Sequence, residues 1–301
     1  MGEPERPRAS FDPKVLMRLS GLEWKARYVM EGFLSGLHGS PFHGLSVEFR
    51  DYRDYQPGDD LRRVDWRLYA RSDRLSVKRF EQETNARCYL ACDTSASMAY
   101  RGQRAWGSKM EAGRVLAAAL CSLLLRQNDA VGCLGMAEGS LRFLPPSRIP
   151  GQLGRLLGRL SGFTPGGGPA LEPLLSQASR LLHRRSLLLV VSDLLEPSEA
   201  AEPALERLRF DGHECLIVQV LDPDEIDFPF AEGTILEDLE TGSRRETRPG
   251  ARERYRRRFE DAMEGWKSLF RRLEVPHALV RTDEDPRRAL TRLLVERKRL
   301  R

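Results

Sequence analysis

The sequence predicts an α/β fold: an open, mostly parallel sheet flanked by helices, with a small β-rich accessory region. Two observations lead to this prediction. Short, continuously apolar runs alternate with helix-length segments along most of the 301 residues. Strands that are apolar on both faces are typical of parallel sheets covered by helices on each side. Hydrophobic residues make up 41% of the chain and charged residues 31%, which fits a globular protein with a substantial core.

The first part of the chain is expected to be helical, and the second to consist of short strands and turns. A helix is predicted to begin after Asp12, because aspartate is a favoured N-cap and Pro13 suits the first helical position, and to run to Gly36. The next stretch is rich in turn residues and in charges of both signs, with strand candidates at 45–49 and 75–80. The predicted divisions of the chain are 1–35, 36–83 and 84–301.

The third division is expected to form the main domain. Its strands are predicted at 87–92, 130–136, 141–145, 186–192, 214–221 and 277–282. Its helices are predicted at 108–126, from about 152, from about 171, at 197–209 and at 287–299. Ser108 and Glu111 form a capping box at the start of the first of these helices. A hairpin is predicted within 228–249, where TILEDLE and SRRETR flank a Thr-Gly turn.

The stretch CDTSASM at the end of the first main-domain strand suggests a cation site. Asp93, Ser95 and Ser97 alternate along the chain, so in an extended or gently turning segment their side chains point to one side. A second buried strand ends just before Asp193, and sites in such sheets collect at the carboxyl ends of the strands. Carboxylate and hydroxyl oxygens suit Mg²⁺ or Mn²⁺. The same residues could also form no more than a polar turn.

Catalytic interpretations of this motif have less support. A serine hydrolase would need a Gly-x-Ser-x-Gly elbow and a histidine partner, and a phosphate-binding loop would need Gly-x-x-x-x-Gly-Lys-Ser/Thr; neither occurs at this spot. Aspartyl phosphotransfer would need a second acid close to the Asp93 nucleophile. A metal-dependent phosphoesterase that uses Asp93 and Asp193 remains the least favoured alternative.

The chain resembles two known groups of proteins. DTSASM after a buried strand resembles the Asp-x-Ser-x-Ser metal-ion-dependent adhesion site of von Willebrand factor A domains, and the alternation of strands and helices resembles that fold. The stretch EFRDYRDYQPGDDLRRVDWRLYARSDRLSVKRFEQET closely resembles the signature of the bacterial domain-of-unknown-function family 58. DPDEIDFPF and EDLETG are similar to the compact cytoplasmic form of the same family, so the resemblance covers nearly the whole chain.

The resemblance implies a metal site and a function. The implied ligands of Mg²⁺ or Mn²⁺ are Asp93, Ser95, Ser97 and Asp193. Relatives also carry a threonine in a glycine-rich loop, but this chain reads TPGGGPALEPLL, and the aligned Gly168 or Pro169 has no side-chain oxygen. A cation held by neutral hydroxyls keeps much of its charge and seeks an acidic protein ligand. The resemblance further implies a MoxR-type AAA+ ATPase as partner, in chaperone-like assembly or maturation of other proteins.

The signature stretch is expected to have a structural or docking role. Its turn, charged and aromatic residues are Tyr55, Gly58, Asp59, Arg63, Asp65, Trp66, Arg71 and Lys78. Residues 50–79 hold nine basic and six aspartate side chains. Tyrosines and a tryptophan beside arginines could stack on nucleic-acid bases, but the aspartates would repel phosphates, which makes this alternative weaker.

Composition narrows the remaining functions. From residue 244 onward the chain has 19 basic and 10 acidic side chains, so nucleic-acid binding by this basic part is a second hypothesis.

The longest apolar run, VLAAALCSLLL, is too short to span a membrane, and no signal peptide is visible, so a cytoplasmic location is expected. The five cysteines lie in or beside apolar runs, which indicates buried, reduced thiols. The primary hypothesis is a non-enzymatic, metal-dependent interaction adaptor.

Overall fold

A computed structural model of the protein describes residues 12–37, 51–54, 76–79, 87–137 and 139–299. The strand predicted at 45–49 lies outside these residues. So do the signature residues Tyr55, Gly58, Asp59, Arg63, Asp65, Trp66 and Arg71. Lys78 lies in β2 (Ser76–Arg79), which pairs antiparallel with β1 (Asp51–Asp54) in a separate two-stranded sheet.

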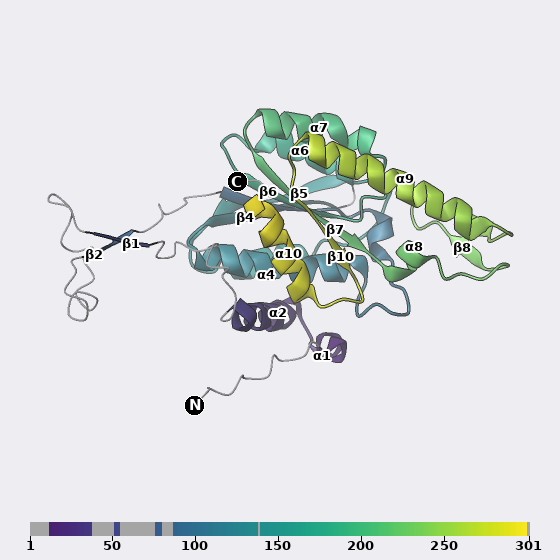
Figure 1. Ribbon diagram of the computed structural model, residues 1–301, viewed down its shortest axis with the longest axis horizontal. Coiled ribbons are helices and arrows are strands. Elements are labelled where there is room, and N and C mark those ends of the chain that lie inside the picture. The colour runs from purple at the N-terminus through teal and green to yellow at the C-terminus, as the bar shows by residue number, and fades with distance from the viewer. Residues whose placement is uncertain (1–11, 38–50, 55–75, 80–86, 138, 300–301) are drawn as a thin grey trace.

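The main sheet has six strands, and the predicted open, mostly parallel arrangement is confirmed (Figure 1). Its strands are β3 (Arg87–Cys92), β4 (Ala130–Ala137), β5 (Ser140–Ser147), β6 (Leu187–Ser192), β7 (Glu214–Leu221) and β10 (His277–Arg281). The order across the sheet is β10-β7-β6-β3-β4-β5, and every neighbouring pair is parallel except the edge pair β4–β5. If the six strands are renumbered 1 to 6 as they occur along the chain and the sheet is read from β5, the order is 3-2-1-4-5-6, which is a doubly wound order. The third strand, β5, runs antiparallel to the others.

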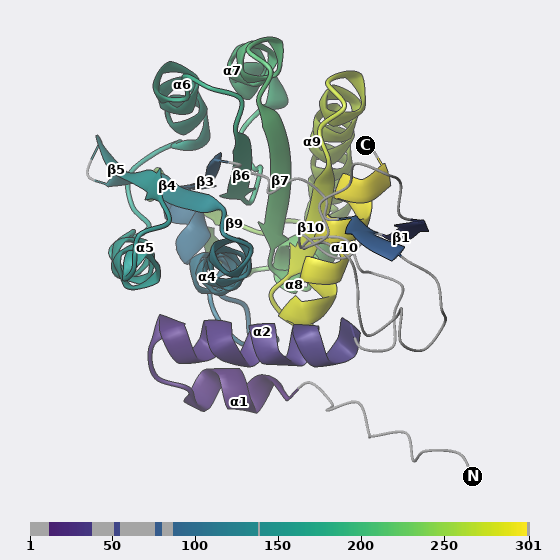
Figure 2. The same cartoon turned by 90° about the vertical axis from the view of Figure 1, so that its left-hand side faces the viewer.

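Helices cover both faces of this sheet, and each face has its own apolar cluster (Figure 2). On one face the cluster includes side chains from α2 (Leu22–Leu37), α4 (Lys109–Arg126), α5 (Gln152–Ser161) and α10 (Pro286–Arg299). On the other it includes side chains from α6 (Leu171–Leu181), α7 (Ser198–Phe210) and α9 (Ala251–Arg272). Alternate residues of β3 belong to the two clusters, because successive side chains of a strand point to opposite faces of the sheet. The strands are therefore apolar on both sides.

Helix α4 lies in the middle of its layer and is apolar around most of its circumference. The run predicted as a core helix is buried along almost its whole length, between the sheet and α2 (Figure 2). Val29, Met30 and Phe33 of α2 are buried in the same cluster as the α4 side chains. A helix that is apolar all round needs a second covering layer, and α2 supplies it.

The structure corrects the predicted N-terminal helix. The chain forms two helices, α1 (Pro13–Arg18) and α2, where one was predicted. The break contains Gly21, whose φ of +85° is a left-handed conformation that a helix interior does not allow. The predicted cap is confirmed, because the Asp12 carboxylate accepts a hydrogen bond from Lys14 N at 2.9 Å.

Two helices follow β7 that the sequence analysis did not predict. The short α8 (Pro223–Asp227) begins at Asp222 with a complete capping box. The 22-residue α9 is rich in arginine and buries Trp266 and Phe270 on one face. Between them the predicted hairpin is confirmed as β8 (Ile235–Glu237) and β9 (Arg244–Glu246).

Two further expectations from the sequence concern the cysteines and membrane-spanning helices. All five cysteines are buried, as expected for thiols in apolar surroundings, and none of them forms a disulfide. Within the part of the chain that the structure describes, no helix has both the length and the apolar character needed to cross a bilayer.

Candidate functional site

The first half of the site is built where β3 ends. Asp93 N still donates to Val191 O at 2.9 Å, so the start of the motif is held against β6. The chain then turns, because the Asp93 carboxylate accepts a hydrogen bond from Ser95 N at 2.8 Å, which is the local contact that aspartate makes in tight turns. Residues Ala96–Ala99 continue as a short 3₁₀ helix. This turn directs the two serine hydroxyls toward the end of the neighbouring strand.

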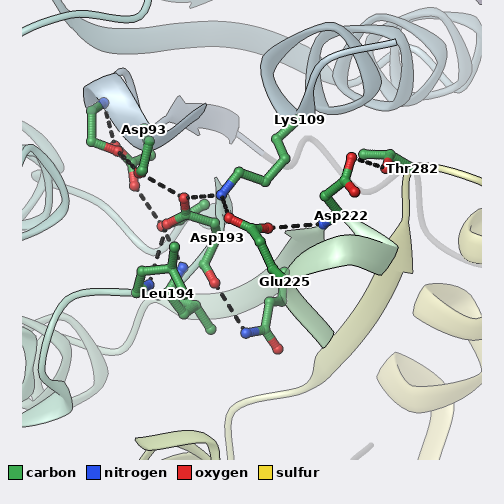
Figure 3. A network of polar contacts seen from close by, with 12 residues as sticks. Asp93, Lys109, Asp193, Leu194, Asp222, Glu225 and Thr282 are labelled. Atoms are coloured by element: carbon green, nitrogen blue, oxygen red, sulfur yellow. Dashed lines mark hydrogen bonds and ion pairs between the residues drawn. The ribbon is translucent and has the colours of Figure 1, made fainter. Parts of the chain in front are cut away.

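The second half of the site comes from the end of β6. Ser97 Oγ donates to Asp193 Oδ2 at 2.7 Å and lies 3.0 Å from Ser95 Oγ. Ser192 Oγ, which the sequence analysis did not select as a site residue, donates to Asp93 Oδ2 at 2.5 Å. The structure therefore brings all four predicted site residues into one polar centre at the carboxyl edge of the sheet. Figure 3 shows Asp93 and Asp193 at this centre.

A lysine that the sequence analysis missed lies at the same centre. Lys109, the first residue of α4, has a fully buried side chain. Its ammonium donates to Asp193 Oδ2 at 2.7 Å and to Glu225 Oε1 at 2.5 Å (Figure 3). Glu225 is fixed in turn, because its other carboxylate oxygen accepts from Asp222 N at 2.9 Å in the α8 capping box.

Lys109 and Glu225 each had a signal in the sequence. A positive charge in the first turn of a helix opposes the helix dipole, so a lysine directly after the Ser108 cap is an unfavourable choice for helix stability alone. Glu225 lies within DPDEIDFPF, one of the stretches on which the family resemblance rests. The sequence could not show that these two residues lie close to Asp193, because 84 positions in the chain separate Lys109 from Asp193.

The site carries more negative than positive charge. Burial first, and then repulsion from Asp193, raises the pKa of Asp93 to about 7, against hydrogen bonds from Ser192 and Ser95. Burial also raises the pKa of Glu225, although the Lys109 ammonium opposes the shift. For Lys109, burial favours the neutral amine, but the two carboxylates outweigh it and raise the pKa. Shifts of this kind indicate carboxylates brought together at a cost in free energy.

The glycine-rich loop before α6 reaches the site with its backbone. Gly166 N donates to Thr94 O at 2.9 Å, and the Glu196 carboxylate, which also repels Asp93, accepts from Ala170 N and Leu171 N at 2.8 and 2.9 Å. Thr164 is exposed in the same loop. The loop is thus fixed beside the motif without contributing a threonine hydroxyl at Gly168 or Pro169.

The donor atoms present suit a hard divalent cation. Within the described residues, no group of three or more histidine, cysteine, aspartate and glutamate side chains is arranged to hold a metal ion, so a cation here would depend on the serine hydroxyls as well. Ser95, Ser97 and Asp193 already share one hydrogen-bonded centre, and the excess of carboxylates over the Lys109 ammonium favours an added positive charge. Oxygen ligands of this type are those that Mg²⁺ and Mn²⁺ take.

A surface cavity of about 610 Å³ lies beside the motif. Its lining includes Arg142 on β5 and Arg155 and Arg159 on α5, as well as Thr164 of the glycine-rich loop. It adjoins the site because Thr94 Oγ1 donates to Met136 O at 2.6 Å, next to Ala137, which lines the cavity. The cavity therefore carries three arginines on the β4–β5 side of the sheet.

Comparison with known proteins gives the family. The model of a family described as "Protein of unknown function DUF58" matches residues 51–267. The chain belongs to this family. The DUF58 match covers the signature stretch from residue 51 onward, the strand-end motif, the β8–β9 hairpin and most of α9. The von Willebrand factor A-like α/β fold expected from the sequence agrees with the strand order and directions of the sheet described above.

Relatives of this DUF58 protein include uncharacterized proteins. One from Mycobacterium bovis and one from Mycobacterium tuberculosis are each 28% identical over 294 residues, covering 96% of this chain and 91% of theirs. Among solved structures, BatB from Bacteroides thetaiotaomicron matches 71% of this chain and 98% of its own, with 19% identity and a TM-score of 0.40. The SpRpn10 VWA domain matches 68% and 93%, with 11% identity and a TM-score of 0.40.

Proposed function

We propose that this DUF58 protein is a non-enzymatic adaptor that captures an acidic side chain of a partner protein at the strand-end site. One observation carries the proposal: Ser95, Ser97 and Asp193 share a single polar centre at the carboxyl edge of the sheet, next to the buried Asp93. A centre of hydroxyls and carboxylates recognises an outside carboxylate when a cation lies between them. The site and the partner's carboxylate then act as two halves of one coordination sphere.

In this proposal the four predicted ligands, Asp93, Ser95, Ser97 and Asp193, hold Mg²⁺ or Mn²⁺. Asp93 also fixes the turn of the motif, because it accepts a hydrogen bond from Ser95 N. The cation, when bound, supplies a positive charge that neutral hydroxyl ligands leave largely uncompensated. The chain's own residues fix the geometry. Lys109 holds the Asp193 carboxylate from the inner side at 2.7 Å, and Ser192 holds Asp93 at 2.5 Å.

A docking function is favoured over catalysis by the way the two aspartates are used. Asp93 accepts hydrogen bonds from Ser95 N and Ser192 Oγ, and Asp193 accepts from Ser97, Lys109 and Leu195 N. Both carboxylates are therefore engaged by donors within the fold, and in this proposal they hold the docking site in shape.

The nucleic-acid alternative also has less support. Several arginines of α9 are paired with carboxylates: Arg256 lies 3.5 Å from Glu260, Arg271 lies 2.6 Å from Glu264, and Arg272 lies 2.7 Å from Glu206. A helix face that alternates in charge is typical of a solvated surface, whereas a phosphate-binding surface leaves its cations free for the ligand.

The partner that the family resemblance favours is a MoxR-type AAA+ ATPase, in assembly or maturation of other proteins. The arginine-lined cavity supports an acidic contact surface on that partner, because complementary charges steer association. The test is co-sedimentation of the two purified proteins. We expect Mn²⁺-dependent binding that Asp93→Ala abolishes and that Arg155→Glu weakens, whereas Arg180→Glu, on the exposed face of α6, leaves it unchanged.

Calorimetric titration of Mn²⁺ and Mg²⁺ tests the site itself. We expect the wild-type protein to bind with a Kd of about a millimolar or tighter, and Asp93→Ala to abolish binding without unfolding the chain. Asp261→Ala, an exposed aspartate of α9, serves as the control and should bind like the wild type. Equal binding by all three proteins would place the cation elsewhere and overturn the proposed site.

A further inference from the structure

The surface cavity beside the strand-end motif is lined by arginines from two elements. Arg142 lies on β5, and Arg155 and Arg159 lie on α5. Because Arg155 and Arg159 are four residues apart, they lie on the same face of their helix. Figure 2 shows α5 beside β4 and β5, at the edge of the sheet. Three guanidinium groups thus line one cavity, whose volume is about 610 Å³.

These guanidinium groups have no partner among the residues that the structure describes. None of the three forms an ion pair or a side-chain hydrogen bond there, and none of the residues that line the cavity is acidic. The arginines of α9 differ in this respect, since Arg271, for example, pairs with Glu264. Like charges four residues apart destabilise a helix, so an anion bound between Arg155 and Arg159 would relieve their repulsion.

Glycine keeps the α5 side of the cavity open. Gly158 lies within the helix and lines the cavity, and a Cβ added there would meet nothing within 4 Å. Close packing within the fold therefore does not account for this glycine. Glycine in a helix interior lowers helix stability relative to alanine, but it allows a ligand to approach the backbone closely. The position is therefore suited to a bound molecule.

The chemistry of the lining favours a ligand that accepts hydrogen bonds and carries several negative charges. Guanidinium groups only donate and stay protonated, and Thr164 adds a hydroxyl to the lining. A carboxylate has two oxygens, which one guanidinium can satisfy in a bidentate pair. Three guanidinium groups are matched better by a diphosphate, which presents more oxygens and more charge, and arginine suits phosphate oxygens in particular.

The size of the cavity leaves room for an organic part beside the diphosphate. Its volume lies within the range of about 300–1,000 Å³ that is typical of small-molecule sites. Leu144 of β5 and Phe163 after α5 also line it, so part of the wall is apolar.

We propose that this cavity binds a phosphorylated small molecule through its diphosphate group, as in a nucleoside diphosphate, and that Arg142, Arg155 and Arg159 contact the phosphates. The inference goes beyond the proposed function, because it requires neither the strand-end cation nor a partner protein. A diphosphate bound here occupies the arginines that the proposed partner contact uses, so ligand and partner compete for the cavity.

The test is calorimetric titration of the full chain with pyrophosphate, ADP and adenosine, in buffer without divalent cations because pyrophosphate chelates them. We expect pyrophosphate and ADP to bind and adenosine not to bind, since the phosphates make the contacts with the arginines. Arg159→Gln should weaken pyrophosphate binding about tenfold, because it removes one charge-assisted contact. Arg180→Gln, which changes an exposed arginine of α6, is the matched control and should bind like the wild type.

A second pair of variants separates a shaped cavity from a general attraction of anions to basic residues. Gly158→Met places a side chain in the cavity without changing the charge, and loss of ADP binding is expected. Gly154→Met makes the same change one turn earlier, at a position that does not line the cavity and where a Cβ also meets nothing within 4 Å. It should bind ADP like the wild type.

The remaining outcomes decide between this inference and others. Equal pyrophosphate affinity of wild type, Arg159→Gln and Arg180→Gln would overturn it. Tighter binding of a polyglutamate peptide than of pyrophosphate or ADP would also overturn it and assign the cavity to an acidic protein segment. Asp93→Ala should bind pyrophosphate like the wild type. A wild-type chain that binds Mn²⁺ but neither pyrophosphate nor ADP would overturn this inference and leave the strand-end site in place.

Discussion

Lys109 shows how a single buried charge organises the site. Its ammonium is fully buried and joins carboxylates from two different elements, Asp193 after β6 and Glu225 in α8. Buried ion pairs of this kind add little net stability when complete, because desolvation offsets the attraction, but they are costly to break. Lys109 therefore fixes where Asp193 lies and ties the site to the start of α4.

Replacing Lys109 by methionine is expected to destabilise the protein. Lys109→Met leaves two carboxylates without their cation, at a cost of about 3–5 kcal/mol in the free energy of unfolding. In Lys109→Met/Glu225→Gln one of these carboxylates is neutral, so part of the loss should return. Urea unfolding at neutral pH measures both. A loss below about 1 kcal/mol in the single variant would contradict the ion-pair geometry, since exposed pairs contribute that little.

His277 at the start of β10 predicts a dependence of stability on pH. Burial, followed by the nearby Lys267, lowers the pKa of its imidazole to about 4, while its Nε2 lies 3.1 Å from Gln219 Oε1. Because the folded-state pKa lies below the unfolded value, the unfolded chain binds more protons between these values. Stability is therefore lost as pH falls from about 6.5 toward 4.

Substitution of His277 isolates this contribution. Between pH 7 and pH 5 the wild type should lose about 2 kcal/mol more than His277→Gln, which cannot take up the proton. Urea unfolding at a series of pH values measures the difference. Parallel pH profiles for the two proteins would mean that the imidazole titrates normally in the folded state.

At the level of elements, α4 positions the site by packing unusually close to the sheet. Gly113 lies one helical turn after Lys109, and a Cβ added there would lie 2.7 Å from Val191 Cγ1. Val191 belongs to β6, the strand that leads into Asp193. The absence of a side chain at Gly113 thus lets α4 bring its first turn to the end of β6.

Filling this contact is expected to destabilise the protein. Gly113→Val should cost about 1–3 kcal/mol through overpacking of a rigid, buried neighbour. Gly154→Val on α5 is the matched control, because a Cβ at Gly154 meets nothing within 4 Å. Thermal and urea unfolding of the pair check the prediction. Equal effects at the two positions would show that α4 can shift away without loss.

At the level of the whole molecule, the N-terminal helix is part of the main core. Phe33 of α2 is buried in the same cluster as the α4 side chains and one face of the sheet, whereas Trp24 on the same helix is 56% exposed. The main sheet packs against the buried helix α4, and α4 packs against the covering helix α2. We expect these layers to unfold together, since none buries its apolar surface alone.

Two aromatic substitutions on α2 test this coupling. Phe33→Ala should lower the free energy of unfolding by about 3–5 kcal/mol and shift the single main transition. Trp24→Ala should have a much smaller effect, because its ring is largely in solvent and contacts Arg27 at 5.3 Å. If α2 were an independent appendage, Phe33→Ala would leave the main transition at the same denaturant concentration.

The sequence determined the sheet and half of the site. Apolar runs such as SLLLVVS identify buried strands because a parallel strand between two helix layers has no polar face. The strand-end motif identified Asp93, Ser95 and Ser97, since residues at spacing two share one side. Asp193 was identified because a second buried strand ends just before it. These inferences succeed because they depend on neighbours in the chain. The long helix α9 was missed, as its many arginines hide an apolar stripe that includes Trp266 and Phe270.

Tertiary structure decided the rest of the site. Lys109, Ser192 and Glu225 belong to three separate elements, and no local pattern shows that they lie beside Asp93 and Asp193. Their convergence follows from the order of strands in the sheet, which places the ends of β3, β6 and β7 side by side. The charge balance of the site arises from that convergence, because electrostatic interactions depend on distance in space and on burial. Neither distance nor burial can be read from the chain alone.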